Sequence, residues 1–296
     1  MANAANSGSA RGAGDPAGVD QGRLVLAATP LGDSRDASGR LLTALAEADV
    51  VAAEDTRRLR SLAAALGVPI GGRVVSHYDA VEAARLPGLL ADVRAGKTVL
   101  VVTDAGMPAV SDPGYRLVAA AAAEGLAVTC LPGPSAVITA LVLSGVPCER
   151  FCFDGFAPRK SGERRRWLGG LIAESRAVVF FESPHRLADT LADAVAVLGD
   201  GRRAAVCREL TKKHEQVLRG TLAELTAWAA DGPVRGEITV VLAGAAPSAA
   251  PTVGSLVAAV RERVDDGERL KDAVSAVAEA AGVPKRELYA ATVAAS

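Results

Sequence analysis

Short apolar runs alternate with longer amphipathic stretches along most of the chain. Runs rich in Val, Leu and Ala between turn-forming residues indicate buried strands, and the most strongly β-branched run spans 98–103. The expected strands lie at 24–28, 50–53, 74–75, 98–103, 128–131, 151–153, 177–181, 204–207, 216–219 and 237–243.

The stretches between these strands have apolar positions every three or four residues, as amphipathic helices do. The expected helices lie at 38–48, 56–66, 80–95, 115–124, 135–143, 162–173, 186–198, 222–230, 253–263, 270–280 and 285–294. Strands that alternate with helices predict an α/β fold with a largely parallel sheet. The closely spaced later strands predict that a second sheet is mixed.

Two breaks in this alternation divide the chain. A Ser-Gly-Val-Pro turn at 144–147 separates two α/β series, and an Ala/Pro/Ser-rich linker at 244–251 precedes a short helical segment. That segment has the helix, glycine turn and helix spacing of a helix-turn-helix unit, although a helical cap without a nucleic-acid role fits the pattern at least as well. We therefore expect a disordered tail, two α/β domains and a C-terminal helical segment, at 1–21, 22–145, 146–244 and 252–296.

Composition narrows the class of protein. Half of the 296 residues are apolar and the formal net charge is −1, which favours a globular protein and excludes a uniformly basic protein that coats nucleic acid. The four cysteines form no CxxC pair and the three histidines no HxxxH pair, so we expect reduced cysteines and no metal site. No apolar run approaches the roughly 18 residues of a membrane-spanning helix, and the N-terminal segment does not have the pattern of a signal peptide. A cytoplasmic protein is expected, with no membrane partner.

Polar loops follow the expected strands of the first half, at the edge where open α/β sheets bind ligands. The loop at 29–33 has a single glycine and is neither a GxGxxG fingerprint nor a P-loop. The loop at 54–58 holds two carboxylates and two guanidinium groups, which suits either a helix N-terminus or an active-site cluster. The loop at 103–114 is rich in Asp, Gly and Pro, and the loop at 131–136 runs into a helix. Each could approach a ligand or be an ordinary connection.

Charged residues of the second half gather in three places. Glu182 and His185 lie in a strand-to-helix loop that lacks the G-x-S-x-G elbow of a hydrolase. A basic cluster at 208–213 follows the next strand, and the segment 159–166 carries five positive charges against one negative. The segment 159–166 is either a solvated helix face or a surface that contacts RNA phosphates.

The motifs are more specific together than singly. In chain order they read TPLGD, AEDTR, TDAGMPAVSDPGY, LPGPSA, RFCFDGFAPRK, FFESPHR, CRELTKKHE and GE. This series resembles the tetrapyrrole methylase-like family of S-adenosylmethionine (AdoMet) methyltransferases, and within it the members that methylate small-subunit ribosomal RNA. Three positions depart from the residues usual in those members: Asp33 replaces Asn, Thr103 replaces Ser and Met107 replaces Thr.

The resemblance implies AdoMet bound in a cleft between two α/β domains, 2′-O-methylation of a cytidine ribose in the 16S rRNA of the 30S subunit at the decoding centre, and a homodimer. It carries the cofactor contacts to Pro30, Leu31, Gly32, Asp104, Ala105, Gly106, Met107, Ser135, Ala136 and Leu210. The charged residues that we expect to contact RNA are Asp55, Arg57, Arg58, Lys160, Arg164, Arg165, Arg166, Arg208 and Lys212.

A carboxylate within hydrogen-bond reach of the ribose hydroxyl would act as a general base. Glu54, Asp55 and Glu182 are candidates, and proton loss to water stays open. Two other functions also stay open. A methyltransferase acting on a small tetrapyrrole would not need the basic segment or the C-terminal helices. A non-catalytic RNA-binding assembly module would not need so many polar loops at strand ends.

Overall fold

The first half of the chain forms a parallel sheet. The structure is a computed structural model that describes residues 22–246 and 252–295, so the tail expected at 1–21 lies outside the described residues. The strand order is β3-β2-β4-β1-β5, and all neighbours are parallel. The strands are β1 (Arg23–Ala27), β2 (Val50–Ala53), β3 (Arg73–Ser76), β4 (Thr98–Val102) and β5 (Ala127–Leu131).

Helices cover both faces of this sheet, because successive side chains of a strand point in opposite directions. Leu24 and Leu26 of β1 join the core cluster beneath α3 and α4, whereas Val25 and Ala27 join the cluster beneath α1 and α2. The carboxyl edge of the sheet remains accessible for a site. The helices are η1 (a 3₁₀ helix, Ser34–Asp36), α1 (Gly39–Glu47), α2 (Thr56–Leu66), α3 (Asp79–Arg94) and α4 (Tyr115–Ala123).

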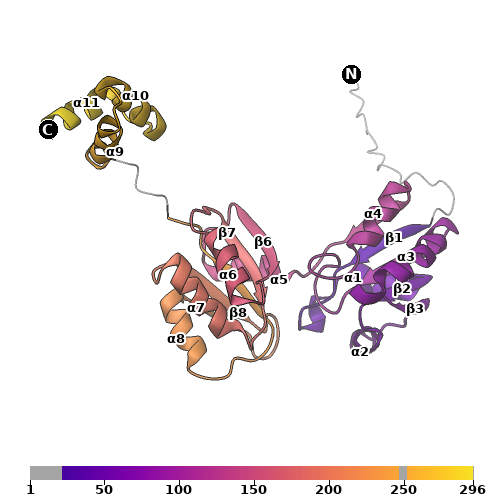
Figure 1. The fold of residues 1–296 in the computed structure, drawn as a ribbon. Helices are drawn as coiled ribbons and strands as arrows, with labels where there is room; N and C mark the ends of the chain where they lie inside the picture. Colours follow the sequence, from indigo (N-terminus) through magenta and orange to yellow (C-terminus); the bar gives the residue numbers. More distant parts are fainter. Residues whose placement is uncertain (1–21, 247–251, 296) are drawn as a thin grey trace, which may run out of the picture.

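The second sheet is mixed, as the closely spaced strands predict. Its order is β6-β7-β10-β8-β9, in which β6 and β7 are parallel and the other neighbours antiparallel. Three helices cover one face and share its core cluster (Figure 1). The strands are β6 (Phe151–Phe156), β7 (Ala177–Glu182), β8 (Arg203–Arg208), β9 (Gln216–Thr221) and β10 (Ile238–Leu242), and the helices are α6 (Ser161–Gly169), α7 (Leu187–Leu198) and α8 (Leu222–Ala230).

Helix α5 (Ala136–Ser144) covers the other face of the second sheet. It precedes the domain boundary expected at 145, yet its side chains Val137, Ala140 and Leu141 share a core cluster with Val179 of β7. In packing, α5 therefore belongs to the second sheet, although it follows directly on the first sheet in the chain.

Three C-terminal helices form a core of their own. α9 (Val253–Asp265), α10 (Leu270–Ala281) and α11 (Lys285–Ala294) pack around Val260 and Leu288. The turn between α10 and α11 uses Gly282 at φ 67°, which is the helix, glycine turn and helix order expected from the sequence. No helix in the described ranges is long and apolar enough to cross a membrane.

The expected strands and helices are all present, with ends that differ by a few residues. The largest difference is α6, which the pattern extends to residue 173 but which ends at Gly169. Gly170 follows immediately, and consecutive glycines weaken a helix because they lose more backbone freedom when ordered. The α/β class, with one parallel sheet, one mixed sheet and a helical C-terminal segment, is confirmed.

Candidate active site

The loops after β1 and β4 are bonded to each other at the carboxyl edge of the parallel sheet. Thr29 and Gly106 exchange two backbone hydrogen bonds with N···O distances of 2.9 and 3.0 Å, and the Thr29 hydroxyl donates to the Thr103 carbonyl at 3.0 Å. Gly106 has φ +81°, a backbone conformation that residues with a Cβ atom rarely adopt. Glycine therefore lets the two loops approach, and their backbone forms a fixed edge for a ligand.

Reciprocal hydrogen bonds join the loops after β2 and β4. Glu54 Oε2 accepts from the Asp104 backbone N–H at 3.1 Å, and Asp104 Oδ1 accepts from the Asp55 N–H at 3.1 Å. Asp104 Oδ2 pairs with Arg58 at 3.0 Å. Burial raises the pKa of Glu54, the hydrogen bond from Asp104 opposes this, and the negative charge of Asp104 adds to it. Of the two carboxylates and two guanidinium groups of this loop, Glu54 and Arg58 therefore form one cluster with Asp104. The Asp55 carboxylate instead pairs with Arg57 at 2.9 Å.

A cavity of about 380 Å³ lies where this edge meets the second sheet. We call it the inter-domain cavity. Loops of the first sheet line one side, and the segments 181–184 and 236–239 of the second sheet line the other. Its volume falls within the roughly 300–1,000 Å³ of small-molecule sites.

Asp112 is a lining residue that the sequence did not single out. It lies in the inter-domain cavity and has no hydrogen-bond or ion-pair partner among the described residues. Burial, followed by the charges of Glu54 and Asp104, raises its pKa to about 7. Ala109 and Ser111 beside it have φ values of 68° and 63°, which non-glycine residues seldom adopt outside functional loops. The second Asp of the 103–114 loop was the only sequence signal.

A second cavity of about 470 Å³ adjoins the first. We call it the α2 cavity, because its outer wall is helix α2 and its inner wall the loop after β1. Four residues line both cavities: Leu31, Glu54, Arg58 and Asp104. The polar cluster at the ends of β2 and β4 therefore lies between the two cavities and borders both.

The structure distributes the predicted cofactor contacts between these spaces. Pro30 and Gly32 line the α2 cavity, and Leu210 lines neither cavity, because it is buried in the core cluster that includes Leu31. Ser135 stands at the N-cap of α5, but its hydroxyl makes no capping hydrogen bond. The remaining predicted contacts all line the inter-domain cavity: Leu31, Asp104, Ala105, Gly106, Met107, Ser135 and Ala136.

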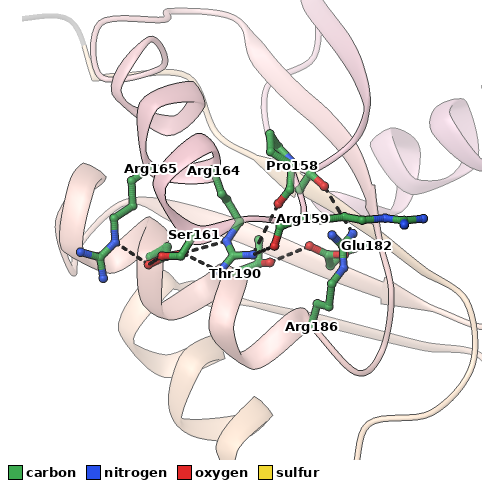
Figure 2. Close-up of polar contacts among 10 residues, drawn as sticks. Pro158, Arg159, Ser161, Arg164, Arg165, Glu182, Arg186 and Thr190 are labelled. Carbon is green, nitrogen blue, oxygen red and sulfur yellow. Dashed lines mark hydrogen bonds and ion pairs between the residues drawn. The ribbon is translucent and has the colours of Figure 1, made fainter.

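The two preferred candidate bases differ in their surroundings. Glu182 lines the inter-domain cavity, but it is only 2% exposed and its carboxylate is engaged on both oxygens. Oε1 accepts from the Ser183 N–H at 2.7 Å. Oε1 also pairs with Arg186, and Oε2 accepts from the Thr190 hydroxyl at 2.6 Å (Figure 2). Glu182 therefore fastens the β7–α7 loop, whereas Glu54 borders both cavities.

The prediction that Arg164 contacts RNA together with the rest of the segment 159–166 does not fit the structure. The Arg164 side chain is 5% exposed and pairs with the equally buried Asp193 of α7 at 2.6 Å. Its Nη1 donates to the carbonyls of Pro158 and Arg159 at 3.4 and 3.3 Å (Figure 2). Burial raises the pKa of Asp193, but hydrogen bonds from Arg165, Arg164 and Ser161 outweigh it and lower that pKa. A guanidinium held in this way is not available to a phosphate.

The other residues predicted to contact RNA are more exposed than Arg164, although Arg57, Arg165 and Lys212 are also paired with carboxylates. Arg58 borders both cavities, and Asp55 and Lys212 line the α2 cavity. Arg208 is partly engaged, because it donates to the Gln216 side chain at 3.1 Å. The rest have exposed side chains on α2, on α6 or just before α6: Arg57, Lys160, Arg165 and Arg166.

Sequence reasoning also missed the wall that the second sheet contributes. Phe181, Ile238 and Thr239 line the inter-domain cavity from β7 and β10. The sequence pattern predicts only that such strand residues are buried in the core, so no local signal indicates that they line a site. In the part of the chain that the structure describes, no group of three His, Cys, Asp or Glu side chains could hold a metal ion.

Comparisons with known proteins agree with this architecture. The family described as Tetrapyrrole (Corrin/Porphyrin) Methylases matches residues 23–226. Among solved structures, the methyltransferase CobJ is similar with a TM-score of 0.59 and 21% identity, covering 76% of this chain and 95% of that one. A Thermus thermophilus uroporphyrin-III C-methyltransferase in complex with S-adenosylhomocysteine gives a TM-score of 0.53 at 16% identity, covering 75% and 96%. These similarities show the shared fold.

Sequence relatives are much more similar. Ribosomal RNA small subunit methyltransferase I of Mycobacterium tuberculosis is 62% identical over 276 residues, which cover 93% of this chain and 96% of the relative. The enzymes of the same name from Halalkalibacterium halodurans and Escherichia coli O157:H7 are 42% and 39% identical, each covering 91% of this chain and 94% of the relative. The chain therefore belongs to the tetrapyrrole methylase family of AdoMet-dependent methyltransferases, in the group of ribosomal RNA small subunit methyltransferases I.

Proposed function

We propose that this protein transfers the methyl group of AdoMet to the 2′-oxygen of a cytidine ribose in the 16S rRNA of the 30S subunit. One observation carries the proposal. The inter-domain cavity, lined by the loops that resemble the family's cofactor loops, adjoins a second open cavity across Leu31 and the cluster of Glu54, Arg58 and Asp104. A cofactor and an acceptor need two such adjoining spaces.

The residues of the inter-domain cavity fit AdoMet. Carboxylates of Glu54, Asp104, Asp112 and Glu237 line it, and acids gathered in a partly buried space favour a cationic ligand. The backbone of 104–107 and the N-terminus of α5 would hold the rest of the molecule. When bound, AdoMet supplies an activated methyl group on a positively charged sulfur.

The chain's own residues then position the acceptor and take its proton. Glu54 is held by the Asp104 N–H at 3.1 Å and faces both cavities, so it can accept the proton of a ribose hydroxyl. Arg58 lies 3.0 Å from Asp104 and is half exposed, so it can reach a neighbouring phosphate. Orientation of the acceptor contributes as much as proton transfer does, because a well-placed nucleophile avoids a large entropic cost.

The direct test is methyl transfer from labelled AdoMet to 30S subunits, followed by nuclease digestion and mass spectrometry. We expect the label in 2′-O-methylcytidine. Label in a tetrapyrrole precursor and none in 30S subunits would instead make the protein a small-molecule methyltransferase. Cofactor-independent binding to 30S subunits without transfer would make it an assembly module.

Asp112 should make cofactor affinity depend on pH. Its pKa of about 7 in the free protein should fall when a sulfonium binds beside it, so AdoMet binding should strengthen as pH rises through 7 and Asp112 ionises. S-adenosylhomocysteine lacks the sulfonium charge but has the same amino acid group. Calorimetry measures the affinity for each ligand. The affinity for AdoMet divided by the affinity for S-adenosylhomocysteine should rise roughly threefold to tenfold between pH 6 and pH 8. In Asp112→Asn the ratio should stay level, and an unchanged slope in that variant would assign the effect to another group.

The exposed part of the basic segment should bind RNA phosphates. Replacing Arg165 and Arg166 with Ala should raise KM for 30S subunits and reduce the salt slope by about 0.7–0.9 per lost phosphate contact. AdoMet affinity should not change. The control is Arg23→Ala with Lys97→Ala, because both residues are exposed at the amino edge of the parallel sheet, away from the site. Equal salt slopes in the two double variants would show that the segment is only a solvated helix face.

A homodimer and a cytoplasmic location follow from the same proposal. Ile138 and Val142 lie one turn apart on α5 and are 48% and 73% exposed, although the opposite side of α5 packs on the second sheet. Exposed apolar side chains next to one another favour a protein contact. A second copy of the chain is the partner that the family resemblance supplies, and the cytoplasm is where 30S subunits are methylated.

A further inference from the structure

Most of the predicted cofactor contacts line the inter-domain cavity, and only Pro30 and Gly32 lie in the α2 cavity alone, so the α2 cavity offers space beside the cofactor. It shares Leu31, Glu54, Arg58 and Asp104 with the inter-domain cavity. A molecule in the α2 cavity would therefore meet a molecule in the inter-domain cavity across the Glu54 carboxylate. An acceptor placed on this side would face the cofactor without occupying the inter-domain cavity.

The walls of the α2 cavity differ in chemistry. Arg58 and Lys212 supply positive charge, and the Lys212 ammonium is fixed between Glu209 and Glu237 at 2.9 and 3.0 Å. Arg58 lies on α2 itself, and further along the same helix Ser61 and Ala65 line the cavity one turn apart with small, exposed side chains. The two cations and the small-residue stretch of α2 suit a phosphate and a flat base. Carboxylates line the same cavity, namely those of Glu54, Asp55 and Asp104.

Two loops that flank this cavity are hydrogen-bonded to each other next to its lining residues Gly32, Ser34 and Lys212. The Asp33 N–H donates to the Thr211 hydroxyl at 3.2 Å, which joins the loop after β1 to the loop after β8. Glu209 and Thr211 have φ values of 53° and 60°. Left-handed backbone at non-glycine residues is retained where surrounding structure holds it in place, and it gathers at ligand sites.

Because this inference rests on the proposed function, its ligand is part of the RNA. We propose that the α2 cavity receives one nucleotide of the RNA, turned out of its stack, and presents its ribose to Glu54 at the wall that the two cavities share. A volume of about 470 Å³ accommodates a single nucleotide and not a duplex. Sequence-specific recognition of RNA generally uses unstacked nucleotides of this kind.

Ala65 and its neighbour Ala64 offer a matched test. Both are exposed on α2, but only Ala65 lines the cavity. Ala65→Phe should fill the space and lower kcat on 30S subunits by roughly 10²-fold, because a displacement of about 1 Å at the reacting atom has an effect of that size. Ala64→Phe, with the same side chain on the same helix, should leave kcat and KM at the parent values. Calorimetry should give both variants an AdoMet affinity within about twofold of the parent.

Ser61→Phe, on the same wall, keeps the test decisive if Ala65→Phe fails to fold. Parent-like kcat in a folded cavity-filling variant would overturn the proposal, and so would a loss of AdoMet affinity as large as the loss of activity, because the space would then belong to the cofactor. Failure of the proposed function has a different signature. In that case the parent protein itself transfers no methyl group to 30S subunits.

Discussion

Glu54→Gln should lower single-turnover methylation of 30S subunits by roughly 10²-fold or more, within the range of general-base effects. The substitution keeps the hydrogen bond from the Asp104 N–H, which is 3.1 Å long, and removes only basicity. AdoMet and 30S affinities should barely change. The rate of the parent should rise with pH through the raised pKa of Glu54 and then level off, since the base acts only when ionised.

Asp112→Asn is the control for this experiment, because Asp112 lines the same cavity but not the α2 cavity. Its single-turnover rate at saturating AdoMet should stay within a few-fold of the parent rate. A large loss in Asp112→Asn together with a parent-like Glu54→Gln would transfer the role of base to Asp112. Parent-like rates in both would show that positioning alone supplies the catalysis.

Arg164→Ala should reduce the free energy of unfolding by about 3–5 kcal/mol, the usual effect of removing one partner of a buried ion pair. The change leaves the 5%-exposed Asp193 with Arg165 and Ser161 alone, and it removes the donor to two backbone carbonyls. Urea denaturation followed by circular dichroism measures the loss. Arg166→Ala, an exposed neighbour on the same helix, should change stability by no more than about 0.5 kcal/mol.

The stability difference between the parent and Arg164→Ala should depend on pH, which provides a second check. Hydrogen bonds lower the pKa of Asp193 in the folded protein, so the stabilisation is present above the ordinary Asp pKa and is lost as pH falls through the lowered value. The difference in free energy of unfolding between the parent and Arg164→Ala should therefore become smaller under strongly acidic conditions. Equal unfolding midpoints at neutral pH would mean that the pair contributes nothing net.

The fold could be predicted from the sequence because its strands are short apolar runs separated by turn residues. The site was predictable where a polar residue follows a strand, as Glu54 and Asp104 do. Arg164 could not be assigned correctly, because a run of charges does not say which side of a helix faces the protein. The missing signal was its partner Asp193, an acid on a mostly apolar helix 29 residues later. Contacts over such separations are set by packing and not by local pattern.

The packing of α5 determines where the two halves of the molecule can bend. Because α5 moves with the second sheet and β5 with the first, any relative movement of the sheets has to be absorbed by the hinge at 132–135. Space there is tight, since a Cβ on Gly133 would lie 2.9 Å from the Ala28 side chain. The hinge ends at Ser135, which lines the inter-domain cavity. The one covalent connection between the two sheets thus ends at a residue of that cavity.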